Sequence, residues 1–420
     1  MAWRSDTVVS LVITAIPWRR ASYIDEVTFA AMKLLTNLDC LQPPLTGIGH
    51  YTKQLAARLA GHPEVEAFRG LYRSRWLDGA QLHDWPPTGD PALAGGGGSA
   101  ALRQRLRRIP GSYGLRHRLR TLRFASLTRR YADHVYWEPG LELMPFAGRR
   151  VATVYDLSHL AVRASHPPAR IAYLRRQIDH TLRHADAIVT ISRTMRREIA
   201  VYAGLQEADI AVAPPAAAAA FRPLEAATRD AVRQRLGLPP RYILSVGTLE
   251  PRKNLERLAQ AYAALPGALR REWPLVCVGA KGWNDTSLSQ ELRRLEARGE
   301  LLRLGYVAQQ DLPLITASAG LMAYPSLYEG FGMPVVEAMA CGVPVLTSRN
   351  TSMHEITGES AFLVEPGETE SIRAVLETAL EDAEARRRLG RQGIARAAYY
   401  DWQRSAEALL ASLKGGAYGA

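Results

Sequence analysis

Short apolar runs alternate with helical patterns along most of this 420-residue chain. The runs are flanked by Gly, Pro or polar residues, as is typical of buried strands in a parallel sheet. Regular alternation of such strands with helices indicates an α/β fold built on doubly wound parallel sheets. We predict strands at residues 33–38, 151–154, 187–191, 241–247, 275–278, 302–304, 321–324 and 343–347.

The length of the chain favours two domains, because a single hydrophobic core rarely grows to 420 residues. The clearest break in composition is the segment from Pro214 to the alanine run that ends at Ala220. We therefore predict one domain at 32–213, a second at 214–398 and a terminal segment at 399–420. An apolar run at 8–16 is too short to cross a membrane. It fits a signal-peptide core, an extra strand or an extension upstream of Met32, and we expect residues 1–31 to be a dispensable extension.

The most informative stretch follows the predicted strand at 321–324. Gly330 and Gly332 permit backbone conformations and close approaches that a side chain would forbid. Pro334 suits the first position of a helix, which we expect to run to Ala340. A glycine loop that leads into a helix presents free N–H groups and the positive end of the helix dipole. The sequence thus predicts an anion site, for example for a diphosphate.

Two carboxylates bracket this loop. Glu329 lies in the loop, where it could accept hydrogen bonds from sugar hydroxyls, and Glu337 lies about one turn into the helix, where it could bind the vicinal hydroxyls of a ribose. The alternative is that both simply satisfy the helix dipole, as single glutamates near a helix start often do. Because the pair flanks this glycine pattern, we favour contact with a ligand.

A second candidate element is the loop after the predicted strand at 241–247. Gly247 and Thr248 lead into Arg252 and Lys253, and a helix begins near Leu255. Cationic side chains in such a loop can face the carboxyl edge of a parallel sheet, where open α/β folds bind ligands. The alternative is a solvated basic pair, since the chain holds 53 Lys and Arg residues.

A third element lies near the start of the first domain. Gly47 and Gly49 fall in a loop that we expect before a helix from about His50 to Ala60. Alone, the two glycines fit an ordinary tight turn.

Together these elements resemble a known family. Glu329 and Glu337 match an E-x7-E motif, and residues 324–342 resemble the retaining GT-B glycosyltransferases of group 1, family GT4. The resemblance implies a GT-B fold, in which two Rossmann-like domains face each other across a cleft and a C-terminal helix crosses back to the first domain. It also implies a donor site made of Gly47, Gly49, Gly247, Thr248, Arg252, Lys253, Glu329, Gly330, Phe331, Gly332, Met333 and Glu337.

The same resemblance implies retaining sugar transfer with Glu329, Lys253 and Arg252 as catalytic residues and with no metal or other cofactor. The family's His-Asp pair corresponds here to Tyr155 and Asp156 on the acceptor side. Tyrosine replaces histidine, so an imidazole role does not transfer. Asp156 either orients an acceptor hydroxyl, which makes it the fourth catalytic candidate, or caps the following turn.

Residues 38–47 and 247–254 are similar to those of bacterial mannosyl- and rhamnosyltransferases of surface polysaccharide assembly. This similarity implies GDP-mannose or GDP-deoxymannose as donor, and a lipid-diphosphate-linked oligosaccharide of O-antigen type as acceptor. Two other classes stay open: a nucleotide-sugar epimerase or hydrolase of the same fold, and a non-catalytic scaffold that binds nucleotide or membrane. The presence of both cations and both glutamates argues against the scaffold.

The net charge of +12 is concentrated in part at residues 101–131, which carry ten arginines and no carboxylate among scattered leucines. This pattern fits a basic amphipathic surface for an anionic membrane or a lipid diphosphate, and also a plain solvated face. Nucleic acid ranks lower because no nucleic-acid module accompanies the run. Three cysteines form no disulfide framework or metal spacing, so we expect a cytoplasmic protein, peripheral on the inner membrane face if the acceptor is lipid-linked.

Overall fold

The structure is a computed structural model that describes residues 31–43, 45–85, 112–162, 168–279 and 290–415. The expected extension, apart from its last residue, and the first part of the basic segment lie outside the described residues. Two sheets organise the chain, one with strands between Met32 and Val212 and one with strands between Ile243 and Val364.

The described part of the first sheet has the strand order β3-β2-β1-β4-β5-β6-β7. All neighbouring strands are parallel except β2 and β3, which form an antiparallel hairpin. The predicted parallel sheet is confirmed, and one antiparallel strand is added at this edge, where a tight turn at Arg73, with φ of 56°, reverses the chain. The strands are β1 (Met32–Asn37), β2 (Val65–Tyr72), β3 (Arg75–Leu77), β4 (Val135–Glu138), β5 (Arg150–Thr153), β6 (Ala187–Thr190) and β7 (Ile210–Val212).

The second sheet is parallel throughout its described strands, with the order β10-β9-β8-β11-β12-β13. It confirms the predicted strands at 241–247, 275–278, 302–304, 321–324 and 343–347, with ends shifted by at most two residues. The strands are β8 (Ile243–Val246), β9 (Leu275–Val278), β10 (Leu301–Gly305), β11 (Leu321–Tyr324), β12 (Val345–Ser348) and β13 (Phe362–Val364).

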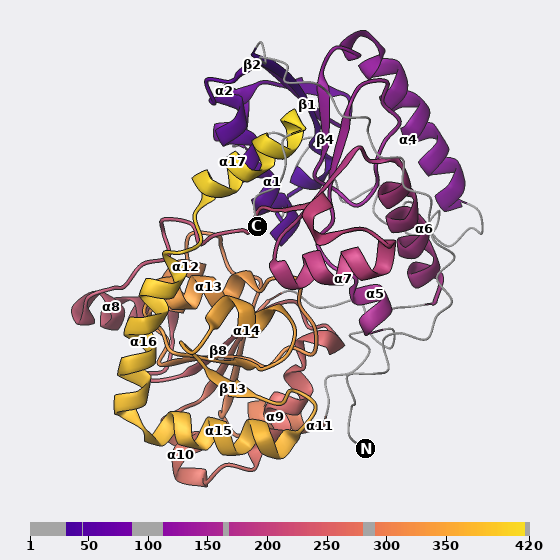
Figure 1. Cartoon of the computed structure of the whole chain (residues 1–420). Coiled ribbons are helices and arrows are strands. Elements are labelled where there is room, and N and C mark those ends of the chain that lie inside the picture. The colour runs from indigo at the N-terminus through magenta and orange to yellow at the C-terminus, as the bar shows by residue number, and fades with distance from the viewer. Residues whose placement is uncertain (1–30, 44, 86–111, 163–167, 280–289, 416–420) are drawn as a thin grey trace.

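Helices cover both sheets (Figure 1). Around the first sheet lie α1 (Gly47–Ala60), α2 (Gly79–His83), α4 (Ser112–Thr128), α5 (Ser158–Ala161), α6 (Pro168–His184) and α7 (Arg193–Ala203). Around the second lie α8 (Ala226–Leu236), α9 (Leu255–Ala263), α10 (Gly267–Glu272), α11 (Gln290–Ala297), α12 (Leu312–Ala317), α13 (Met333–Ala340), α14 (Ser352–Thr357), α15 (Thr369–Glu381) and α16 (Ala383–Ala397).

The last described helix, α17 (Trp402–Lys414), packs against α1, β6 and β7 rather than against the second sheet. Figure 1 shows it in yellow beside the indigo α1, far from the rest of the C-terminal half. Leu409 and Leu413 of α17 are fully buried, and the Arg149 guanidinium donates to the carbonyls of Leu413 and Ser412 at 3.1 and 3.2 Å. Helix α17 thus completes the core around the first sheet.

Candidate donor site

The loop between β11 and α13 contacts the first domain directly. A Cβ atom at Gly330 would lie 2.2 Å from the carbonyl oxygen of Tyr155, so only glycine allows this approach. The Ser192 hydroxyl, at the N-cap of α7, donates to the Gly330 carbonyl at 2.8 Å. Gly332 caps α13 with φ of 106°, and the helix begins at Met333. We had expected Pro334 at the first helical position, but it occupies the second.

Glu329 lies at the centre of a buried ionic cluster. Its Oε1 atom accepts hydrogen bonds from the Lys253 ammonium at 2.7 Å, the Ser326 hydroxyl at 2.6 Å and the Tyr324 hydroxyl at 3.0 Å. Its Oε2 atom lies 2.8 Å from Nη1 of Arg252. The structure therefore brings together the two elements that sequence reasoning had identified separately.

These contacts change the interpretation of Glu329. A carboxylate oxygen offers about two lone-pair sites, so Oε1 is saturated by three donors while Oε2 keeps room for one more. Burial alone raises the pKa of the Glu329 carboxyl, but Lys253 and Arg252 bring it down to about 2, which keeps it ionised. Glu329 thus positions the two cations, and Oε2 alone has capacity left for a sugar hydroxyl.

Arg252 and Lys253 lie in a 3-10 turn at Pro251–Lys253, directly before α9. The next residue, Asn254, is buried with φ of 61° and donates to the carbonyls of Pro325 and Pro366 at 2.9 and 2.7 Å. The Arg252 carbonyl in turn accepts from the Leu327 N–H at 2.8 Å and lies 2.9 Å from the Ser326 hydroxyl oxygen. These bonds join the loops after β8 and β11, so both cations are fixed at the carboxyl edge of the sheet.

Charge and burial have opposite effects on the pKa values of Arg252 and Lys253, and the balance differs between the two residues. Burial lowers the pKa of Lys253, and its contact with Glu329 offsets part of this effect. Burial also acts to lower the pKa of Arg252, but Glu329 outweighs it and the pKa is raised. Arg252 therefore stays positively charged. The charged form of Lys253 is stabilised by its anionic neighbours, and a second anion nearby would stabilise it further.

Glu337 differs from Glu329 in having no partner among the described residues. It lies on α13 and is partly exposed, and burial raises the pKa of its carboxyl to about 7. A carboxylate without protein donors suits the predicted contact with ribose hydroxyls, which stays a prediction.

On the first domain, Tyr155 and Asp156 lie against Gly330 in the loop between β11 and α13. The Tyr155 hydroxyl donates to the Pro139 carbonyl at 2.6 Å, within its own domain. One oxygen of Asp156, Oδ1, accepts from the Ser158 N–H at 2.9 Å, so this residue does cap the turn. Its other oxygen has no hydrogen bond or ion pair in the described structure, which leaves the acceptor role open as well.

The glycines near the first strand are placed differently from our expectation. Helix α1 begins at Gly47 rather than near His50, because Thr46 caps it and accepts from the Gly49 N–H at 3.3 Å. Gly47 and Gly49 therefore belong to the first helical turn. Tyr51, one turn further, packs edge to face on Tyr155 at 5.4 Å between ring centroids, which connects this turn to the donor loop.

The remaining residues of the predicted donor site differ in whether their side chains are exposed or buried. Gly247 directly follows β8, and Met333 is the first residue of α13. The Thr248 side chain is exposed, and its hydroxyl lies 3.4 Å from the Glu250 carboxylate. Phe331 is buried and packs edge to face on Tyr400 at 5.2 Å, so only its backbone could meet a ligand.

Sequence reasoning missed three polar residues of the same stretch. Tyr324 and Ser326 bond to Glu329, and the Tyr328 hydroxyl reaches across to the first domain, where it donates to Glu198 at 2.5 Å and accepts from the Leu157 N–H at 3.3 Å. Tyr324 ends the buried strand β11, and Ser326 and Tyr328 follow it closely; this position was the available signal. Among the described residues, no group of three or more His, Cys, Asp or Glu side chains could hold a metal ion.

Comparison with known proteins extends this picture. A family model described as "Glycosyl transferases group 1" matches residues 228–396. The chain is 33% identical over 373 residues to O-antigen chain mannosyltransferase B of Escherichia coli. The alignment covers 89% of this chain and 97% of that protein.

Two solved structures share the fold. The crystal structure of Anabaena Alr3699/HepE in complex with UDP and glucose matches with a TM-score of 0.67 at 19% identity, over 91% of this chain and 100% of that one. WaaG, a glycosyltransferase involved in lipopolysaccharide biosynthesis, matches with a TM-score of 0.67 at 16% identity, over 92% and 100%.

Two parallel sheets with a cationic site at the carboxyl edge of the second one define a GT-B glycosyltransferase fold. The chain belongs to the group 1 glycosyltransferase family, GT4, and is a glycosyltransferase that uses a nucleotide-sugar donor.

Proposed function

We propose that this enzyme is a retaining mannosyltransferase that transfers mannose, or a deoxymannose such as rhamnose, from a GDP-sugar to a hydroxyl of a lipid-linked oligosaccharide. The relative named O-antigen chain mannosyltransferase B, which aligns over nearly its whole length, supports the sugar and the pathway type. The buried cluster of Arg252, Lys253 and Glu329 carries the transferase chemistry of this proposal.

In the proposed reaction, the bond between the sugar C1 and the diphosphate oxygen breaks, and the diphosphate leaves with the electron pair. The acceptor hydroxyl oxygen attacks C1 from the same face, and its proton passes to the leaving phosphate oxygen. Arg252 and Lys253 stabilise the charge that develops on the diphosphate, since fixed cations in a water-poor site are worth more than in water. Glu329 holds both cations in place before the donor arrives.

The surface of the first domain supports a lipid-linked acceptor. On α4, Leu119 and Leu122 are 59% and 68% exposed, and Arg118 and Arg123 are exposed beside them. Apolar side chains between arginines on a helix surface favour contact with an anionic membrane interface. Among the described residues, no helix is long and apolar enough to span a bilayer.

The decisive experiment incubates the protein with GDP-mannose, GDP-rhamnose, UDP-glucose or dTDP-rhamnose and a lipid-diphosphate-linked oligosaccharide, then identifies the product by mass spectrometry and the anomeric configuration by NMR. We expect one added α-linked hexose or deoxyhexose with a GDP-sugar only. Transfer from UDP- or dTDP-sugars alone would refute the donor assignment. Free sugar or an altered nucleotide sugar without acceptor would favour a hydrolase or an epimerase.

Vesicle sedimentation tests the membrane contact separately. We expect the protein to sediment with vesicles containing about one third anionic phospholipid and the double variant Leu119→Asn/Leu122→Asn to lose at least half of this binding, because the apolar contact is removed while the charges stay. Val201→Asn, a substitution at another exposed apolar position, is the matched control. Equal loss in the control would contradict a specific role for α4.

A further inference from the structure

A second hollow lies in the second domain, at the edge of the sheet opposite the donor site. Its volume is about 610 Å³, a size typical of small-molecule sites. Arg241, Gly320 and Pro344 of its lining each precede a strand of the sheet, whereas the donor cluster follows the strands. The hollow is therefore a separate site and not an extension of the donor cleft.

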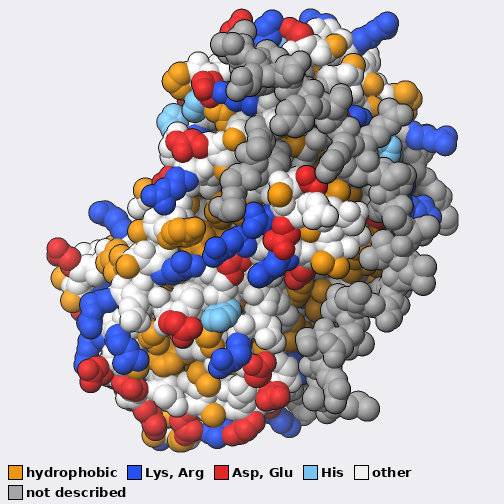
Figure 2. Space-filling model, in the orientation of Figure 1, with side chains coloured by type: hydrophobic (Ala, Val, Ile, Leu, Met, Phe, Trp, Pro, Cys, Tyr) orange, Lys and Arg blue, Asp and Glu red, His pale blue; other side chains and the backbone are white. Residues whose placement is uncertain are grey.

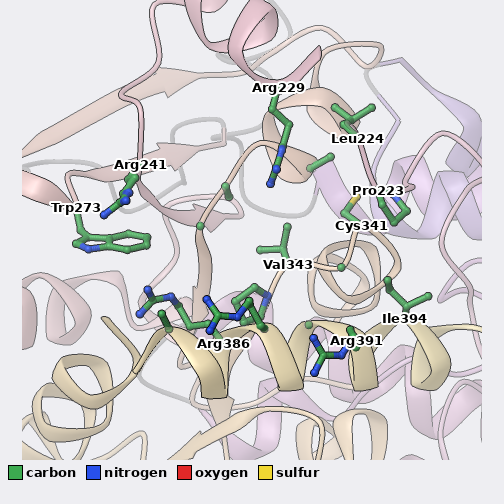
Figure 3. Close-up of a pocket in the computed structure, with 18 residues that line it drawn as sticks. Pro223, Leu224, Arg229, Arg241, Trp273, Cys341, Val343, Arg386, Arg391 and Ile394 are labelled. Carbon is green, nitrogen blue, oxygen red and sulfur yellow. The ribbon is translucent and has the colours of Figure 1, made fainter. Parts of the chain in front are cut away.

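The lining of this hollow is strongly basic. It contains five arginines and no Asp or Glu residue. In Figure 3, Arg229 reaches into the hollow from one side, Arg386 and Arg391 lie along α16 on the other, and Arg241 lies beside Trp273 at one end. Figure 2 shows basic side chains gathered on this flank of the second domain. The lining arginines are Arg229, Arg241, Arg386, Arg387 and Arg391.

Two of these arginines are already held by the protein. Arg241 forms an ion pair with Glu272, and Arg386 donates to the Ala379 carbonyl at 2.6 Å. Both also lie over the ring of Trp273, with the Arg386 guanidinium 4.8 Å from the centroid. They form a fixed cationic wall.

The guanidinium groups of the other three arginines have no hydrogen bond or ion pair to the described part of the chain. The Nε atom of Arg229 is buried without a partner, which is costly unless a ligand satisfies it. Arg387 and Arg391 lie one turn apart on the same face of α16, a spacing at which like charges destabilise a helix. The fold therefore maintains three unpaired guanidinium groups around one hollow.

Apolar side chains complete the lining of the hollow, among them Pro223, Leu224, Val343 and Ile394. A ligand that fits must combine several negative charges with a carbon framework. Guanidinium groups pair with phosphate oxygens in bidentate geometry, and a single phosphate does not neutralise three of them. We propose that this hollow binds a small molecule that carries at least two phosphate groups.

Isothermal titration calorimetry with inorganic tripolyphosphate tests this proposal at constant ionic strength. The parent protein for the titrations is the Lys253→Ala variant, in which anion binding at the donor site is weakened. We expect it to bind tripolyphosphate, and Arg387→Gln/Arg391→Gln in the same background to bind at least about tenfold more weakly, because two charge-assisted contacts are lost. Arg388→Gln, exposed on α16 outside the lining, is the matched control and should bind like the parent.

Thermal unfolding shows whether the variants are folded. The double variant should be at least as stable as the parent without ligand, since Arg387 and Arg391 have no partners to lose, and it should not gain stability from tripolyphosphate. Unchanged affinity in the double variant, equal weakening in Arg388→Gln, or no binding by the parent would each overturn the proposal.

Discussion

At the scale of single residues, the central feature is the unequal role of the two glutamates. Glu329 is occupied by two cations and two hydroxyls, whereas Glu337 has no partner among the described residues. The sequence motif presents them as an equivalent pair. The structure separates a residue that organises the site from one that remains available to a ligand.

Substitution of the cationic cluster should therefore affect both activity and stability. Lys253→Ala should abolish sugar transfer with little loss of stability, because Arg252 still pairs with Glu329. Glu329→Ala should abolish transfer and also lower the free energy of unfolding by about 3 kcal/mol, since buried Lys253 loses its ion pair and Arg252 keeps only the pair with Glu250. Donor turnover and urea unfolding measure the two effects. Near-normal turnover in either variant would refute the catalytic assignment.

The raised pKa of Glu337 predicts a pH-dependent stability effect. Burial raises the pKa from the ordinary 4.5 to about 7 in the folded protein, so folding favours the protonated form. The contribution of the protonated Glu337 carboxyl to the stability of the fold is complete below pH 4.5 and is lost as the pH rises through 7. Glu337→Gln should thus become more stable than the natural protein between pH 5 and pH 8, by about 3 kcal/mol at the upper end.

Urea unfolding across this pH range checks the effect, and Glu384→Gln, exposed on α16, is the control and should show no trend. A pH-independent difference for Glu337→Gln would contradict the raised pKa. The same variant should raise the donor KM more than it lowers kcat, and an unchanged KM would remove Glu337 from the ribose role.

At the scale of elements, the decisive contact is the loop between β11 and α13 against the first domain. A Cβ at Gly330 would meet the backbone of Tyr155 and lie 3.1 Å from the Cβ of Asp156, and backbone cannot move aside locally. Gly330→Ala should therefore displace the two domains and reduce turnover at least tenfold, with a small change in melting temperature. Gly367→Ala, where an added Cβ meets nothing within 4 Å, is the matched control. Full activity of Gly330→Ala would show that this approach is not needed.

Sequence patterns located the strands and loops of the second domain well because its strands are short, apolar and punctuated by Gly and Pro. The same signals could not reveal that Arg252 and Lys253 meet Glu329, since that contact joins loops 76 residues apart. They also missed the start of α1, because two glycines in a first helical turn look like a loop until Thr46 is seen to cap it. Contacts across the chain, such as Tyr328 with Glu198, carry no local signature.

At the scale of the whole molecule, one apolar core includes residues of both sheets and of α17. Trp402, Leu409 and Leu413 of this helix are buried against the first domain. A chain that ends at residue 400 should therefore lose stability in the first domain, although it keeps every strand of both sheets. We expect lower melting temperature and strong binding of a hydrophobic dye.

The quadruple change Gln403→Ala, Arg404→Ala, Glu407→Ala and Lys414→Ala leaves the buried face of α17 unchanged and serves as the control. These side chains lie on or near the surface, so the altered protein should bind little dye. Equal stability of the truncated and full chains would contradict a structural role for α17.

The position of α17 also sets an order of events during synthesis. Domains usually fold as they emerge from the ribosome, the N-terminal one first. Here the apolar face of α1 packs against α17, which is synthesised on the order of tens of seconds after β7 at about 5–20 residues per second. During that interval the nascent first domain carries an uncovered hydrophobic groove. Its dependence on chaperones should therefore end only when the last helix has left the ribosome.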